Sequence, residues 1–172
     1  MLLPKLFAAG TVLLDIAIVL AVSAWLLDYA GLKKFDPAWM KKIGSYRLEI
    51  IFLLALGGSL GSIILEYVTG WQPCMLCWYQ RIFLYPQVFL AGTALLLERQ
   101  DVTDYLVPLN LVGGAVAVYH YMIQMIENLS FGCSGLVDCS NVYATHFGYV
   151  TIPVMSLTVF AALLLVSVTP DG

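Results

Sequence analysis

The sequence contains few charged residues. Only 11% of its 172 residues are charged, whereas a soluble domain carries roughly 25%. Eight Lys and Arg against eleven Asp and Glu give a net charge of -3, so the chain lacks the basic surface of a nucleic-acid-binding protein. It also lacks a phosphate-binding glycine loop and a dinucleotide fingerprint. These shortages exclude nucleic acid as a partner and favour membrane lipid as the surroundings.

Long uncharged runs take up most of the chain, in which 61% of the residues are hydrophobic. Such runs suit a bilayer core of about 30 Å. The connections between them are short and polar, and no second domain or repeat is present. We therefore predict an all-α membrane protein with five spans. The expected spans are Leu6 to Leu27, Ile50 to Leu65, Ile82 to Leu97, Tyr105 to Ile126, and Gly148 to Val168.

The basic residues predict the orientation of these spans. Five of the eight lie between the first and second spans, which predicts that this loop is cytoplasmic. Alternation then places the loops 69–80 and 127–147 outside, and these two loops contain all four cysteines. Disulfides persist on that side of the membrane. The five basic residues are Lys33, Lys34, Lys41, Lys42 and Arg47.

One acidic residue lies inside a predicted span. Asp15 is in the middle of the first span, where a charge is costly, so it should face protein, water or a polar partner. A proton or ion role and a neutral, hydrogen-bonded carboxyl are both open at this point.

A C-x-x-C motif precedes the third span. Cys74 and Cys77 follow Pro73, which predicts that the pair begins a helix, where the helix dipole favours the reactive thiolate. Trp78 stands where a c-type haem attachment would need His. Arg81, one turn below Cys77, needs an anion, and the candidates are the thiolate, a lipid phosphate or a bound electron acceptor. Redox exchange is favoured over a structural disulfide.

The second outer loop contains another pair of cysteines, Cys133 and Cys139. Their separation of six disfavours a zinc site with two C-x-x-C pairs, so no metal is expected. Alone, such a pair is most often a static disulfide. Two pairs on one side of the membrane, however, can pass two electrons between them by thiol-disulfide exchange.

Two polar residues lie near the outer end of the fourth span. His120 and Gln124 are one turn apart, at about the depth expected for Arg81. They are either hydrogen-bonding contacts between helices or, with Arg81, the lining of one pocket. A lipid-soluble quinone is the obvious electron acceptor in a bilayer.

Four segments in this order resemble the DsbB family of disulfide bond formation proteins. They are Cys74–Arg81, Tyr119–Gln124, the cysteines 133 and 139, and Phe147–Pro153. The resemblance implies a four-helix transmembrane bundle in a prokaryotic cell membrane. It also implies that the protein reoxidises a DsbA-like thioredoxin-fold partner and passes the electrons to a quinone of the ubiquinone or menaquinone type.

The resemblance also implies roles for individual residues. Cys74 and Cys77 correspond to the quinone-linked pair, with Cys77 next to the quinone, which Arg81 contacts. His120 lies near the quinone ring, and Gln124 is expected in the same site. Cys133 corresponds to the cysteine that forms a mixed disulfide with the partner, and Cys139 to its resolving mate.

The resemblance covers about Leu48 to Val168 and divides the chain. Residues 46–172 correspond to the four-helix bundle, and residues 1–45 form an additional N-terminal transmembrane helix with a basic cytoplasmic loop. The loop that holds the second cysteine pair is short, as in the compact branch of the family. Two alternatives stay open: a quinone reductase resembling vitamin K epoxide reductase, and a non-enzymatic membrane scaffold with structural disulfides. Arg81 and the segment Phe147–Pro153 argue against the first.

Overall fold

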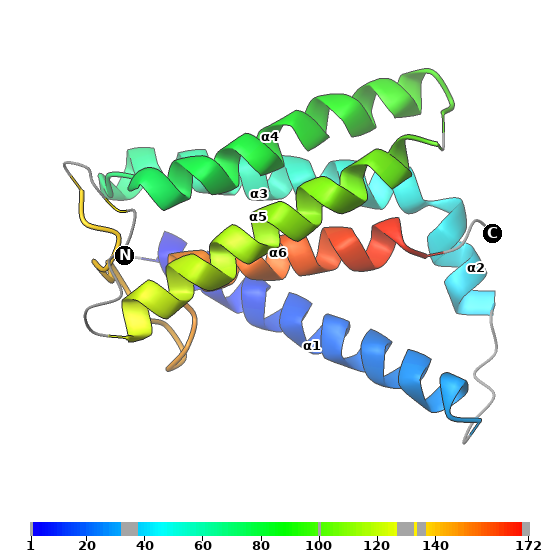
Figure 1. The fold of residues 1–172 in the computed structure, drawn as a ribbon, viewed down its shortest axis with the longest axis horizontal. Coiled ribbons are helices and arrows are strands. Elements are labelled where there is room, and N and C mark those ends of the chain that lie inside the picture. The colour runs from blue at the N-terminus through cyan, green and yellow to red at the C-terminus, as the bar shows by residue number, and fades with distance from the viewer. Residues whose placement is uncertain (1, 32–37, 100, 127–132, 134–136, 170–172) are drawn as a thin grey trace.

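The chain forms a bundle of helices (Figure 1). The computed structural model describes residues 2–31, 38–99, 101–126, 133 and 137–169. Within these residues there is no β-strand, only an isolated bridge between His146 and Val150. The prediction of an all-α protein is confirmed for this part of the chain. Its helices are α1 (Leu3–Tyr29), α2 (Ala38–Ser45), α3 (Arg47–Thr69), α4 (Met75–Leu96), α5 (Val102–Met125) and α6 (Ile152–Ser167).

Several helices are suited to a membrane. In the described part of the chain, α1, α3 and α5 are long and apolar enough to cross one, which confirms the prediction of a membrane protein. Helix α6 is apolar but has only 16 residues. Helix α4 has 22 residues, yet Gln80, Arg81 and Gln87 make it more polar than the other three. The crossing of α4 and α6 therefore stays a prediction.

The basic segment after the first span differs from the expected loop. Helix α2 lies in it, at the end of the bundle opposite the cysteines (Figure 1). Lys33 and Lys34 are outside the described residues. Arg47 is the first residue of α3 and is buried, and its Nη1 donates a hydrogen bond to the carbonyl of Thr169, 3.1 Å away. A guanidinium is favourable there because the last carbonyls of a helix lack partners within the helix.

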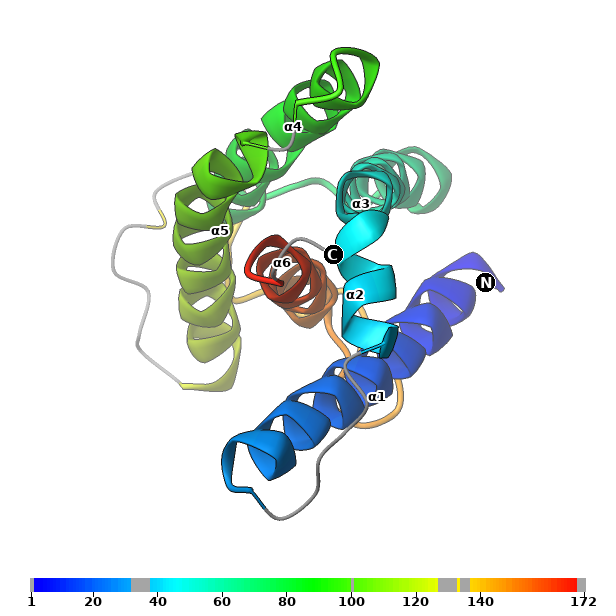
Figure 2. The same cartoon turned by 90° about the vertical axis from the view of Figure 1, so that its right-hand side faces the viewer.

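Helix α6 lies in the middle of the bundle, with α1, α3 and α5 around it (Figure 2). Its Phe160 is almost fully buried, and the ring packs so closely on α5 that a Cβ at Gly113 would overlap it. Between α4 and α5, the buried amide of Gln87 donates to Asn110 over 2.9 Å. An apolar core and this buried polar pair therefore help to hold the four helices from α3 to α6 together.

Helix α1 lies at the side of this bundle. It runs beside α6 near its N-terminal end and diverges from it toward Tyr29 (Figure 1). The Asp15 carboxylate accepts hydrogen bonds from Thr158, at 2.6 Å, and Tyr149, at 2.9 Å. The expectation that Asp15 faces a polar partner is thus confirmed. On α3, a Cβ at Gly61 would lie 2.9 Å from the Phe7 ring, so this glycine allows α1 to approach.

Candidate functional site

The first cysteine pair lies at the start of α4. Helix α3 ends at Thr69, and the left-handed conformation of the next residue, Gly70, with φ of 71°, turns the chain. Cys74 is the extended residue that precedes α4, and Cys77 lies in the first turn. Both are free thiols, with sulfur atoms 3.3 Å apart, and only Cys77 is partly exposed. The prediction that the pair begins a helix is confirmed.

Cys74 faces α5 and its buried histidine. His120 Nε2 lies 3.6 Å from the Cys74 sulfur and 3.2 Å from the carbonyl oxygen of Cys139. Gln80 Nε2 lies 3.1 Å from His120 Nδ1. A carbonyl only accepts and an amide nitrogen only donates, so this arrangement suits an imidazole protonated on Nε2. His120 therefore connects the two cysteine pairs.

The surroundings of Cys74 favour its thiolate. Its pKa is lowered from the ordinary value, chiefly because the thiolate shares a hydrogen bond with the Cys77 thiol. Burial opposes this effect, and the hydrogen bond with His120 adds to it. Because the thiolate is the form that attacks disulfides, Cys74 is equipped for exchange.

The second pair lies against the first. Cys133 and Cys139 form a disulfide with an S–S distance of 1.99 Å, as the family resemblance implies. Cys139 is buried in one cluster with Cys74, Leu76 and Ile123. Cys133 is less buried. Residues 127–132 and 134–136, which include Gly132 and Gly135, are outside the described residues.

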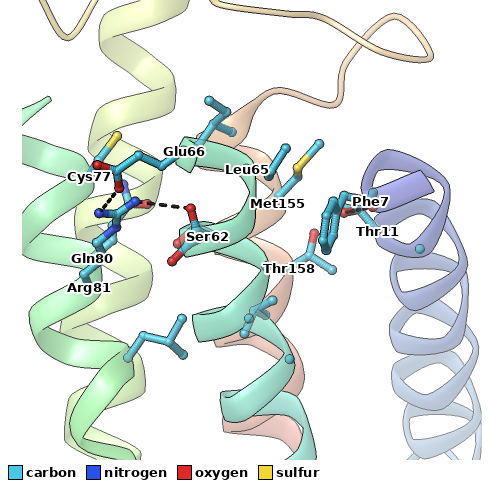
Figure 3. A pocket seen from close by; sticks show the side chains of 18 of the residues that line it. Phe7, Thr11, Ser62, Leu65, Glu66, Cys77, Gln80, Arg81, Met155 and Thr158 are labelled. Carbon is cyan, nitrogen blue, oxygen red and sulfur yellow. Dashed lines mark hydrogen bonds and ion pairs between the residues drawn. The ribbon is translucent and has the colours of Figure 1, made fainter. Parts of the chain in front are cut away.

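Arg81 has an anion partner that the sequence analysis did not identify. Its Nη1 lies 2.7 Å from Glu66 Oε2, and its Nη2 donates to the carbonyl of Ser62 over 3.3 Å (Figure 3). Its guanidinium carbon is also 5.0 Å from the centre of the Trp78 ring. Glu66 lies in the last turn of α3, one residue beyond the predicted span. A charged residue so close to a span needs a partner of opposite charge, and this holds for both Glu66 and Arg81. The sequence could therefore have indicated that these two residues pair.

A pocket of about 390 Å³ adjoins Arg81 and Cys77. Helices α1, α3, α4 and α6 line it, and Glu66, Cys77, Gln80 and Arg81 make one end of it polar (Figure 3). Cys77 therefore opens into the pocket, whereas Cys74 faces the second cysteine pair. Gln80 lines the pocket and also contacts His120, so it joins the two sides of the site.

The polar residues predicted to share one pocket are divided in the structure. Among the described residues that line the pocket, Arg81 is present but His120 and Gln124 are not. His120 lies behind the thiols, against Cys74. Gln124 donates a hydrogen bond to the carbonyl of Asn141, 3.3 Å away, and so holds the loop after Cys139.

The thiols and the histidine also form a set of possible metal ligands. One ligand atom from each of Cys74, Cys77 and His120 lies within 4.8 Å of the others. Three such ligands with an open fourth position are a known zinc arrangement. The set was not predicted, because His120 lies in α5, far in sequence from Cys74 and Cys77. The absence of a metal stays a prediction.

Comparisons with known proteins agree with the motifs. The family profile described as disulfide bond formation protein DsbB matches residues 47–169. "Disulfide bond formation protein C" of Bacillus subtilis is 34% identical over 124 residues, which are 68% of this chain and 90% of that protein. "Probable disulfide formation protein" of Chlamydia trachomatis is 36% identical over 124 residues, 72% of this chain and 91% of that protein. No solved structure matches the chain.

Proposed function

Because the chain belongs to the DsbB family of disulfide bond formation proteins, we propose that it is a membrane thiol oxidase that reoxidises a DsbA-like thioredoxin-fold partner and transfers the electrons to a quinone. The observation that carries this proposal is the position of the first cysteine pair between the second pair and the pocket.

The partner reacts first with the second pair. Of the two bonded cysteines, Cys133 is the more accessible and Cys139 is buried. A thiolate of the reduced partner therefore attacks the sulfur of Cys133, forms a mixed disulfide and releases Cys139 as a thiolate. This assignment agrees with the role that the family resemblance gives Cys133.

The released thiolate then reaches the first pair. In the enzyme with both pairs oxidised, Cys139 attacks the Cys74 sulfur and releases the Cys77 thiolate toward the pocket. The second thiol of the partner resolves its mixed disulfide, so the partner leaves oxidised and Cys133 leaves as a thiolate. Cys133 then attacks Cys139, which restores the second disulfide and leaves Cys74 and Cys77 reduced.

The pocket fits an electron acceptor with polar ring oxygens. A bound quinone would accept two electrons and two protons. Arg81 offers a guanidinium fork that can hold such an oxygen near Cys77, and Glu66 fixes the fork in place. The Cys74–Cys77 dithiol loses two electrons and two protons and becomes a disulfide. The remaining lining is largely apolar, which suits a lipid-soluble molecule.

The proposed topology has five spans, α1 and α3 to α6, in a prokaryotic cell membrane. Both cysteine pairs lie at one end of the bundle, and α2 with its basic residues lies at the other (Figure 1). The positive-inside rule then makes the cysteine end extracytoplasmic.

The test of the function is oxidation of a reduced thioredoxin-fold protein by the purified chain. With quinone added, the unchanged protein should oxidise many equivalents of the partner, and Cys77→Ser should oxidise none beyond its own second disulfide. A non-enzymatic scaffold predicts no turnover in either protein. A quinone reductase of the vitamin K epoxide type predicts reduction of an epoxide substrate, which we do not expect.

A further inference from the structure

We propose that α1 forms one wall of an extended subsite for the prenyl tail of the quinone. This inference rests on the proposed function, and it concerns a helix that lies outside the matched residues 47–169. The pocket that contains Cys77 and Arg81 continues past α3 to α1, where Phe7 and Thr11 line its far side (Figure 3).

Helix α3 contributes a continuous stripe to this pocket. The lining residues come in adjacent pairs that repeat every four positions, so they share one helix face. The stripe starts at Glu66 beside Arg81 and ends at Leu53, and at 1.5 Å per residue it is about 20 Å long. Such a length exceeds what a single quinone ring occupies. The pairs are Leu53 and Leu54, Gly57 and Gly58, Gly61 and Ser62, and Leu65 and Glu66.

Helix α1 presents the same pattern across the gap. Its lining residues are Leu6, Phe7, Gly10, Thr11 and Leu14, which again follow one helix face. Gly10 and Gly57 leave space open on the two helices, whereas Gly61 lies against the Phe7 ring. A Cβ added at Gly10 or at Gly57 would meet no atom of the described residues within 4 Å.

Two threonines that line this half of the pocket already have partners for their hydroxyl groups. The Thr11 hydroxyl donates to the carbonyl of Phe7 over 2.9 Å. The Thr158 hydroxyl lies 2.6 Å from Asp15 and 3.0 Å from the carbonyl of Val154. These threonines therefore offer methyl groups rather than free hydroxyls to the pocket. The surface that remains suits a hydrocarbon.

Asp15 holds this wall in position. Its two carboxylate oxygens accept hydrogen bonds from Thr158 of α6 and from Tyr149 in the segment before α6. This polar contact between α1 and α6 lies next to Leu14, the last α1 residue that lines the pocket. The wall therefore has a fixed distance from α6, which a tail-binding groove requires.

The occupant follows from the continuity of the pocket. Its polar end holds Cys77 and Arg81, which the proposed function assigns to the quinone head. A prenyl tail attached to that head must leave the polar end, and the apolar stripe between α1 and α3 begins there. The competing occupant is a phospholipid acyl chain, which would have no connection to the redox site.

Steady-state oxidation of the partner in detergent tests this inference. Four quinones are compared: a benzoquinone and a naphthoquinone, each with and without a prenyl tail. Gly10→Leu and Gly57→Leu fill the open space from opposite sides. Ala115→Leu, on the exposed face of α5 and outside the pocket, is the matched control. Each variant is compared with the unchanged protein on the same quinone, so that partitioning into micelles cancels.

The pocket variants should raise the KM for the prenylated quinone roughly tenfold, the effect of losing about two buried CH₂ groups. They should leave the KM for the tail-less quinone unchanged, and Ala115→Leu should change neither. Equal effects on both quinones, or no effect on either, would overturn the subsite. Absence of quinone-dependent oxidation in the unchanged protein would instead overturn the proposed function and the subsite with it.

A second measurement uses the unchanged protein and does not depend on the folding of a variant. A quinone that carries a diazirine at the end of its prenyl tail should label the α1 segment 6–14 on irradiation. Labelling confined to α4 and α5 would overturn the inference, and so would labelling of α1 that excess unlabelled prenylated quinone does not reduce.

Discussion

Replacement of Arg81 by alanine should weaken quinone use and leave the reaction with the partner intact. The guanidinium makes a 2.7 Å ion pair with Glu66 and lines the pocket beside Cys77. Hydrogen bonds to charged groups contribute about 1.5–3 kcal/mol. The loss of one such bond to the acceptor corresponds to a roughly tenfold to hundredfold increase in the KM for quinone.

The ion pair predicts an additional effect. Arg81→Ala leaves the Glu66 carboxylate without its partner in the pocket, where it repels the negative charge that develops on the acceptor. The double variant Arg81→Ala with Glu66→Gln should therefore recover part of the lost activity, because the neutral amide removes this repulsion. Arg81→Lys should fall between the unchanged protein and Arg81→Ala, since an ammonium keeps the charge but loses the planar fork.

The assay measures partner oxidation against quinone concentration, together with the rate of exchange between the reduced partner and Cys133 in the absence of quinone. The KM for quinone should be lowest for the unchanged protein and highest for Arg81→Ala. Arg81→Lys and the double variant should lie between these limits, whereas the exchange rate should not change in any variant. An Arg81→Ala protein with an unchanged KM would refute the reasoning and leave Arg81 only as an anchor for α4. A double variant no better than Arg81→Ala would refute the role assigned to Glu66.

Three other predictions test the surroundings of the site. His120→Ala should raise the pKa of Cys74, so the pH profile of Cys74 alkylation, followed by mass spectrometry, should move to higher pH; an unmoved profile would contradict the histidine contact. Gly113→Ala should destabilise the protein by about 1–3 kcal/mol through overpacking. Gly114→Ala is the control, because its added Cβ would lie 3.7 Å from Phe160, and in detergent it should unfold near the unfolding temperature of the unchanged protein. In intact cells an impermeant maleimide should label reduced Cys133, which is less buried than Cys74, but not a cysteine placed at Ser45, and the reverse would overturn the topology.

The helices were largely predictable because their signals are local. Uncharged runs located α1 and the four helices of the bundle, and Pro73 with the following apolar run located the start of α4. Helix α2 was not predicted, because its short sequence is too polar to stand out from a loop. The predicted third span, Ile82 to Leu97, began later than α4 itself, since the first turns of α4 contain Gln80 and Arg81 and do not resemble a span.

The site was predictable only in part because it depends on contacts between helices. The four cysteines and Arg81 carry recognisable motifs, but Glu66 and Gln80 belong to no motif. Their partners, Arg81 and His120, lie 15 and 40 residues away in sequence. Depth in the membrane suggested that His120 and Arg81 share one pocket. Depth alone does not specify which way a side chain points around the helix.

The order of the cysteines in electron transfer is the central claim, and disulfide mapping tests it most directly. The fully oxidised protein is mixed with reduced thioredoxin-fold partner in the absence of quinone, quenched with acid and analysed by mass spectrometry. The account predicts a disulfide between Cys74 and Cys139, with Cys133 bonded to the partner and Cys77 present as a free thiol. A disulfide between Cys77 and Cys139, or a Cys74–Cys77 disulfide that stays intact while the partner is oxidised, would contradict it.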